Sequence, residues 1–336
     1  MRCTQAIVVL GLLIGSAHQA WAGEPSLERE FQRLAPLSGG TMGIAALHLE
    51  SGRGAWLNAD DAFPMASTYK IPIAVHLLRL VEEGKLSLEQ RVDIGVEEYS
   101  PGSGMLAKLL DDPGLSVSIK NLLEIMLLIS DNTATDRLLE TVGGGGAVTA
   151  RMQALGVGAI RVDRPTIRLI GDWLGVADMP SASGRTWDDY EALASVRSEA
   201  DRQQAALAFE TDPRDTATPR AMANLLAMIW RGNALNPAST ALLLDIMERC
   251  ETGEARLKGM LPAGTVVAHK TGTIGRTAND VGIITLPHDA GHVIVAAFVK
   301  ESNLDDAERD RAIAEVARAA HDYFLFVDAK PASTAP

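Results

Sequence analysis

Strand-like segments near both ends of the chain enclose a long helical middle, and this order limits the possible folds more than any other feature. Runs with strand character cover residues 41–49 and 55–58, and three more cover 265–269, 281–286 and 292–299. Helical periodicity occupies most of the chain between them. We therefore predict an α/β fold of the α+β sandwich type. Its antiparallel sheet is formed from both chain ends and flanked by helices, with an inserted all-helical subdomain.

Apolar periodicity and capping signals place the expected helices within this plan. Their ranges are 25–37, 67–83, an interrupted region over 119–155, 218–230 and 305–326. One domain is predicted over 23–328, and its helical subdomain over about 85–260.

The chain begins with the pattern of a secretory signal. Arg2 precedes a short apolar run over 6–14, and the Ala-Trp-Ala stretch at 20–22 supplies a small-x-small cleavage pattern. The run is too short for a stable anchor, although an uncleaved signal anchor is the alternative. We predict a signal peptide over 1–22, a periplasmic or secreted protein without a stable membrane anchor, and a disordered tail over 329–336.

Charge and cysteine content exclude several classes of function. The 336 residues include 31 basic and 43 acidic side chains, a net charge of −12, which argues against nucleic-acid binding. Removal of the signal leaves Cys250 alone, so an internal disulfide is excluded and a buried thiol is expected. The seven histidines show no metal-ligand spacing. We expect a monomer that has no metal or other cofactor and that binds a small molecule.

The first of three short motifs is Ser67-Thr-Tyr-Lys70, at the start of the helix expected over 67–83. An i, i+3 spacing places two side chains on one face of a helix. The helix dipole favours negative charge on the serine oxygen, and an amine nearby can activate a hydroxyl that is otherwise a poor nucleophile. Ser67 is a candidate nucleophile and Lys70 its base or electrostatic activator. For an isolated copy, a capping serine followed by a surface lysine is the alternative.

The second motif, Ser130-Asp131-Asn132, interrupts two helical patterns. Its serine can relay a proton to a leaving nitrogen. Asn132 can hydrogen-bond a substrate amide, and Asp131 can brace the loop through backbone contacts. The alternative is a helix-capping turn, because all three residue types are favoured caps.

The third motif, Lys270-Thr-Gly-Thr273, follows the apolar run 266–268. A glycine there lets an extended substrate approach the strand backbone, so Gly272 is a candidate binding residue. Lys270, Thr271 and Thr273 offer a cation and two hydroxyls for a carboxylate. The backbone N–H groups of Ser67 and Thr273 can form an oxyanion hole. The predicted catalytic side chains are thus Ser67, Lys70, Ser130 and Lys270; for this motif a plain strand end is the alternative.

The three motifs in this order resemble those of class A serine β-lactamases, within the larger family that includes penicillin-binding D,D-peptidases. The likeness runs from about 41 to 326. Further matching stretches are Phe63-Pro-Met-Ala-Ser67, Ser130-Asp-Asn-Thr-Ala134, Asp215-Thr-Ala-Thr-Pro219 and Asn279-Asp-Val-Gly282. The resemblance implies that Tyr99 lines the cleft entrance and that Arg276 supplements Lys270 in holding a carboxylate. It also implies that Arg164 pairs with Asp215 at the base of the loop called Ω.

The chain departs from this family in the Ω loop. The family pattern is similar to Arg-Leu-Asp-Arg-x-Glu-x-x-Leu-Asn, whose glutamate and asparagine hold the deacylating water. Here Thr166 stands in place of the glutamate and Ile170 in place of the asparagine. Neither can act as a general base at neutral pH. Candidate replacement carboxylates are Asp163, Asp172, Glu191, Glu199 and Glu210, and nothing in the sequence selects among them.

The same loop carries an insert over about 171–210, which makes it about 35 residues longer than in the family. It contains Trp173, Trp187, Tyr190 and a helical stretch over about 186–209. A lid, a partner-binding surface and a solvated helix all fit this composition.

Three functions remain open at this point. The first is a secreted β-lactamase that opens β-lactam amides through a Ser67 acyl-enzyme, with deacylation slow or rebuilt. The second is a penicillin-binding D,D-peptidase or peptidoglycan amidase, whose substrate is a cell-wall peptide and which turns β-lactams over poorly. The missing glutamate favours the second, because loss of a general base costs about 10²–10⁴-fold in the step it serves. The close match to class A favours the first. A non-catalytic β-lactam or muropeptide sensor is the third.

Overall fold

The computed structural model describes residues 22–110 and 115–327. The predicted signal peptide, apart from Ala22, and the predicted tail over 329–336 lie outside the described residues. No helix within the described ranges is long and apolar enough to cross a membrane.

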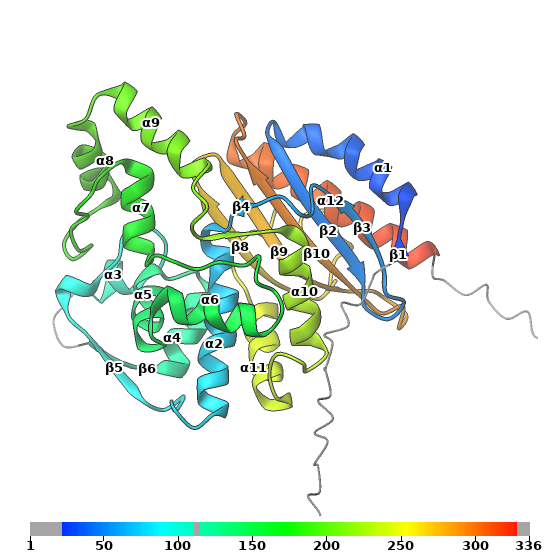
Figure 1. Ribbon diagram of the computed structural model, residues 1–336, viewed down its shortest axis with the longest axis horizontal. Helices are drawn as coiled ribbons and strands as arrows, with labels where there is room; N and C mark the ends of the chain where they lie inside the picture. The colour runs from blue at the N-terminus through cyan, green and yellow to red at the C-terminus, as the bar shows by residue number, and fades with distance from the viewer. Residues whose placement is uncertain (1–21, 111–114, 328–336) are drawn as a thin grey trace, which may run out of the picture.

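A six-stranded sheet forms the centre of the molecule, and its strands come from both ends of the chain (Figure 1). The strand order is β1 (Ala22–Gly23), β3 (Arg53–Leu57), β2 (Thr41–His48), β10 (His292–Lys300), β9 (Thr277–Thr285) and β8 (Val267–Ile274). All neighbours pair antiparallel except the two-residue β1, which is parallel to β3. The predicted antiparallel sheet is confirmed.

Helices cover both faces of this sheet. On one face, α1 (Pro25–Leu34) and the long α12 (Asp306–Val327) pack together through residues such as Phe31 and Val316 (Figure 1). On the other face, α2 (Lys70–Glu82) and α10 (Pro219–Trp230) contribute Ile71 and Met222 to a larger core. The first nine residues of α2 are all buried, as expected of a helix that crosses the centre of a domain.

The segment between β3 and β8 is mostly helical. Its helices besides α2 and α10 are α3 (Leu106–Leu109), α4 (Ile119–Leu128), α5 (Asn132–Thr141), α6 (Gly144–Ala154), α7 (Thr166–Leu174), α8 (Trp187–Ser195), α9 (Glu199–Glu210) and α11 (Pro237–Glu248). The segment is not all-helical, however, because β5 (Arg91–Ile94) pairs with β6 (Leu115–Ser118). The strand signal was present, since Val92 and Ile94 are buried while Arg91 and Asp93 are exposed. Two further short strands, β4 (Phe63–Pro64) and β7 (Thr216–Ala217), also pair.

Three expected boundaries differ from the structure. The helix predicted from residue 67 begins with a 3₁₀ turn, η2 (Ala66–Tyr69), before α2. Strand β8 continues through the third motif, because it stays paired with β9 as far as Ile274. The helical stretch predicted over 186–209 is two helices, since the side chain of Ser198 caps α9 by accepting a hydrogen bond from the N–H of Asp201.

Candidate active site

Ser67 lies in the η2 turn, where the backbone is strained and closely packed. The preceding Ala66 has φ of 45°, a left-handed conformation that costs a non-glycine residue free energy. Strand β8 lies against this turn: a Cβ on Gly272 would come within 2.5 Å of the carbonyl oxygen of Met65 and 2.9 Å of the Ser67 nitrogen. Gly272 was predicted to let a substrate approach the strand. Its lack of a side chain also lets the η2 turn pack on β8.

Lys70 joins the first motif to the second. Its buried Nζ lies 2.7 Å from the carbonyl oxygen of Ser130, 3.0 Å from Ser130 Oγ and 2.9 Å from Asn132 Oδ1. Burial, with a smaller contribution from the nearby Lys270, holds the pKa of Lys70 well below its usual value. A neutral amine in this position can accept a proton from a neighbouring hydroxyl.

The second motif forms a strained turn between α4 and α5. Ser130 has φ of 60°, also in the left-handed region. Asp131 accepts hydrogen bonds from the N–H groups of Met105, Leu106 and Ala134, at 2.7, 3.0 and 2.9 Å. Its carboxylate thus caps α5 and fixes the facing loop. Asn132 donates to the carbonyl of Pro101 at 2.7 Å, which sets the direction of its amide.

Around the third motif, Lys270 is fully buried and donates to the carbonyl of Thr271 at 3.0 Å. Burial lowers the pKa of Lys270 to about 8. Beside it lies Arg256, which sequence reasoning missed; this guanidinium donates to Thr273 Oγ1 at 2.7 Å and to the carbonyl of Gly272 at 3.1 Å. Arg256 lies in an irregular segment between α11 and β8, and no spacing or motif in the sequence points to it.

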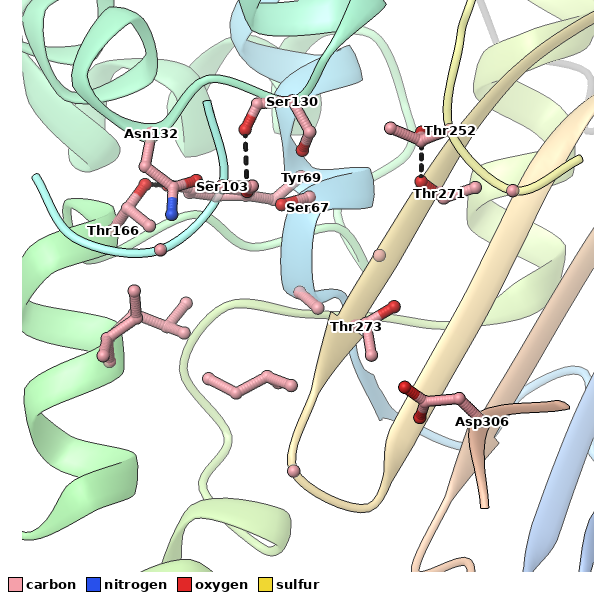
Figure 2. Close-up of a pocket in the computed structure, with 18 of the residues that line it drawn as sticks. Ser67, Tyr69, Ser103, Ser130, Asn132, Thr166, Thr252, Thr271, Thr273 and Asp306 are labelled. Atoms are coloured by element: carbon pink, nitrogen blue, oxygen red, sulfur yellow. Dashed lines mark hydrogen bonds between the residues drawn. The ribbon is translucent and has the colours of Figure 1, made fainter. Parts of the chain in front are cut away.

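These groups line one cavity of about 590 Å³, shown in Figure 2. The helical side contributes Ser67, Tyr69, Ser130 and Asn132, and the sheet side contributes Thr271 and Thr273 (Figure 2). Gly272 and Arg256 also belong to the lining, whereas Lys70 and Lys270 do not. The cavity therefore brings together two serine hydroxyls and the guanidinium of Arg256, which pairs with Asp310, and the buried amine of Lys70 contacts the second hydroxyl.

Two residues predicted by resemblance do not reach this cavity. Tyr99 is fully buried, and its hydroxyl donates to the carbonyl of Leu110 instead of lining the entrance. Arg276 donates to the carbonyl of Glu301 at 2.6 Å and to Asn303 Oδ1 at 2.9 Å, so its guanidinium is held by the loop at 301–303. Neither residue is part of the cavity lining, whose arginines are Arg256 and Arg309.

The base of the Ω loop carries the expected ion pair. Arg164 Nε donates to Asp215 Oδ2 at 2.6 Å, and Nη1 lies 2.6 Å from Asp172 and 3.0 Å from Asp212. Both Arg164 and Asp215 are buried, with exposed fractions of 5% and 2%. Burial outweighs the arginine contact at Asp215 and raises the pKa of its carboxyl.

None of the five candidate replacement carboxylates lines the cavity. Asp172 pairs with Arg164, and Asp163 with Arg161. Glu191 accepts from the indole of Trp187, Glu199 pairs with Arg202, and Glu210 lies 3.4 Å from Arg276. Thr166, Leu169 and Ile170 occupy the wall instead, so this side of the cavity holds a hydroxyl and apolar groups.

The insert reaches the cavity through two tryptophans. The rings of Trp173 and Trp187 stack with centroids 6.4 Å apart, and both line the cavity. Trp187 also lines a second hollow of about 700 Å³, which shares Gly102 and Ser103 with the first. The amide N–H of Ala182 donates to the carbonyl of Tyr99 at 2.8 Å and so ties this end of the insert to the body. The sequence left three roles open for the insert: a lid, a partner-binding surface or a solvated helix. Because two of its tryptophans line the cavity, the insert is not simply a solvated helix.

Within the described ranges, no group of three or more histidine, cysteine or acidic side chains is placed to hold a metal ion. Cys250 is buried, with an exposed fraction of 3%. The side chains that line the cavity offer hydroxyl, amide and guanidinium groups and the carboxylates of Asp306 and Asp310, and the Lys70 amine contacts Ser130 Oγ.

The arrangement matches known proteins along nearly the whole chain. The family model described as "Beta-lactamase enzyme family" matches residues 26–324. The extended-spectrum β-lactamase PER-1 from Pseudomonas aeruginosa is 30% identical over 317 residues, which cover 92% of this chain and 91% of that protein.

Two solved structures place the fold within the same family. An ancestral class A β-lactamase is 32% identical with a TM-score of 0.71, and the match covers 88% of this chain and 99% of that one. A point mutant of PBP-A, in an acyl-enzyme complex with penicillin-G, is 27% identical with a TM-score of 0.72. That match covers 90% of this chain and 97% of that one. This fold and these relatives define the class A type of serine hydrolase. This chain belongs to the β-lactamase enzyme family.

Proposed function

We propose that the protein hydrolyses β-lactams through an acyl-enzyme on Ser67. The observation that carries this proposal is the set of contacts at Lys70. Its Nζ contacts Ser130 and Asn132, which line the same cavity as Ser67. A neutral Lys70 accepts the proton of Ser67 as its Oγ attacks the lactam carbonyl. Ser130 then passes a proton to the lactam nitrogen as the ring opens.

Two further parts of the site are assigned on the same basis. The N–H of Ser67 lies against Gly272, the residue before Thr273, and we assign the oxyanion hole to the N–H groups of Ser67 and Thr273. Thr271, Thr273, Lys270 and Arg256 together supply hydroxyls and positive charge for the carboxylate that most β-lactams carry. Arg256 takes the role that the sequence suggested for Arg276.

A D,D-peptidase acting on cell-wall peptides is the second candidate, and a specific observation favours it. Thr166 and Ile170 line the cavity on the side of the Ω loop and provide no carboxylate there. One similar structure, the PBP-A mutant, is an acyl-enzyme complex with penicillin-G. An enzyme that lacks a deacylating base retains its acyl group.

The two candidates are separated by direct kinetics. Purified protein is mixed with benzylpenicillin, and ring opening is followed by absorbance; in parallel, release of D-alanine from a diacylated Lys-D-Ala-D-Ala peptide is measured. We expect multiple turnovers of penicillin and little D-alanine. Release of D-alanine with only one penicillin consumed per protein would favour the peptidase.

Localisation and assembly complete the proposal. The N-terminal pattern supports export to the periplasm or exterior, and a site built from residues of a single chain is consistent with the expected monomer. Neither β-lactam hydrolysis nor D,D-peptidase activity requires a nucleic-acid partner.

The pKa of Lys270 leads to a prediction about pH. Because that pKa is about 8, the amine is cationic below pH 8 and becomes neutral as the pH rises through this value. The attraction of the Lys270 amine for a substrate carboxylate is then lost. We expect KM for benzylpenicillin to rise severalfold between about pH 7 and pH 9.5. The control is penicillin methyl ester, whose KM should not follow the same titration; an equal rise for both substrates would contradict the assignment.

A further inference from the structure

A hydroxyl of the Ser67 turn is in direct contact with a hydroxyl of the Ω loop. Tyr69 Oη and Thr166 Oγ1 are 2.6 Å apart, and both residues line the cavity that contains Ser67 (Figure 2). Their side chains are almost fully buried, with exposed fractions of 1% for Tyr69 and 5% for Thr166. Burial and the nearby Asp136 hold the pKa of Tyr69 well above its usual value, so it remains a hydrogen-bond donor.

Behind Thr166 lies a carboxylate that the sequence did not single out. Asp136, on α5, accepts hydrogen bonds from the N–H groups of Thr166 and Ile167 and from Ser100 Oγ, the last at 2.6 Å. Asp136 is therefore in contact with the backbone of Thr166, and the Thr166 hydroxyl is among the groups that lower the pKa of the Asp136 carboxyl, against the larger raising effect of burial. No lysine or arginine in the described ranges forms an ion pair with Asp136, which therefore keeps its basicity, and burial raises its pKa.

Asp136 lies outside the cavity but contacts Thr166, a residue of its lining. Asp136 does not line the cavity of Ser67; it lines a separate hollow of about 540 Å³ together with Ser100, Pro165 and Ile167. Thr166 is thus the hydroxyl that separates the cavity from a carboxylate on its outer side. A hydroxyl donates one hydrogen bond and accepts two, so Thr166 can donate to Asp136 while it accepts from Tyr69 and from a water.

We propose that Thr166 and Asp136 form a hydroxyl–carboxylate relay that deprotonates the hydrolytic water when the acyl group leaves Ser67. This inference rests on the proposed acyl-enzyme. The water oxygen bonds to the ester carbon, its proton passes to Thr166 Oγ1, and the hydroxyl proton of Thr166 passes to Asp136. The carbonyl electron pair becomes the oxyanion. When the oxyanion collapses, the bond to Ser67 Oγ breaks, and the proton held by Asp136 returns through Thr166 to Ser67 Oγ.

The first test compares Thr166→Val with Thr166→Ser. Both keep the backbone N–H that Asp136 binds, but only serine keeps the hydroxyl. Acylation and deacylation by benzylpenicillin are measured separately by stopped flow and intact mass. We expect Thr166→Val to slow deacylation by about 100-fold or more and to leave acylation within about threefold, with Thr166→Ser near wild type. A Thr166→Val enzyme that deacylates at the wild-type rate would overturn the relay.

A second test separates proton transfer from anchoring of the Ω loop. Asp136→Asn is introduced into the wild type and into Thr166→Glu, where a carboxylate at 166 serves as base without Asp136. If Asp136 acts as proton acceptor, its replacement slows deacylation far more in the wild type than in Thr166→Glu. Equal losses in both backgrounds mean that Asp136 only anchors α7, which would refute the relay.

The failure of each proposal has its own signature. If neither an adduct nor product forms on the wild-type enzyme, and no adduct forms on Thr166→Val, the Ser67 acyl-enzyme itself is contradicted. An adduct that wild type and Thr166→Val release equally fast contradicts only the relay, whereas an adduct that the wild type never releases contradicts β-lactam turnover as well.

Discussion

Replacing Ser67 by alanine is expected to abolish covalent labelling by penicillin and to lower β-lactam hydrolysis by about 10⁴-fold or more. The other two hydroxyls of the η2 turn are already engaged: Thr68 donates to the carbonyl of Met65 at 2.8 Å, and Tyr69 contacts Thr166. Lys70 would keep its contacts to the second motif, so the fold should be retained. Intact mass after incubation with benzylpenicillin checks the loss of labelling, and thermal unfolding checks the fold.

Ser87→Ala is a suitable matched control. This serine is exposed in the turn after α2 and hydrogen-bonds to Glu89, remote from the cavity lining. The control should label and hydrolyse as the wild type does. An adduct of unchanged stoichiometry on Ser67→Ala would show that a different residue is the nucleophile.

Replacing Arg164 by alanine is expected to lower the free energy of unfolding by about 3–5 kcal/mol, the usual cost of breaking a buried ion pair. Arg164 contacts Asp215, Asp172 and Asp212, and its removal leaves the carboxylate of Asp215 buried without this cation. Burial raises the pKa of Asp215 even though the Arg164 contact lowers it, so loss of that cation leaves the penalty of burial with less to offset it. Urea unfolding followed by circular dichroism measures the change.

The control for Arg164 is Arg33→Ala, which breaks the exposed pair with Glu30 on α1. Exposed pairs contribute about 0–1 kcal/mol, so this variant should unfold near the wild-type midpoint. If Arg164→Ala is no less stable than Arg33→Ala, the contacts of Arg164 with the three aspartates do not hold the Ω loop.

Local spacing predicted the parts of the site that lie close together in sequence. The separation of three residues between Ser67 and Lys70 fixes their relative position wherever the turn is placed. The alternation of apolar residues likewise predicted the sheet strands, because each buries one face or both. In the second motif, the capping residues predicted a turn, and Asp131 caps α5.

Contacts made by tertiary packing could not be predicted in this way. Arg256 reaches the cavity from an irregular segment, and Asp136 reaches Thr166 across 30 residues of sequence. Resemblance indicated Arg276 and Tyr99, but the first is held by the loop at 301–303 and the second is buried. The candidate replacement bases all belonged to the loop itself, whereas the carboxylate that contacts Thr166 lies on α5.

The most direct measurement is intact mass against time for the protein mixed with benzylpenicillin, with product formation followed in parallel. We expect a transient adduct of one penicillin per protein that disappears as many product molecules accumulate. Together with the absence of an adduct on Ser67→Ala, that result would show that Ser67 is acylated and released although Thr166 stands where the class A pattern has a glutamate. An adduct that persists at one per protein without further product, or the absence of both adduct and product, would contradict this account.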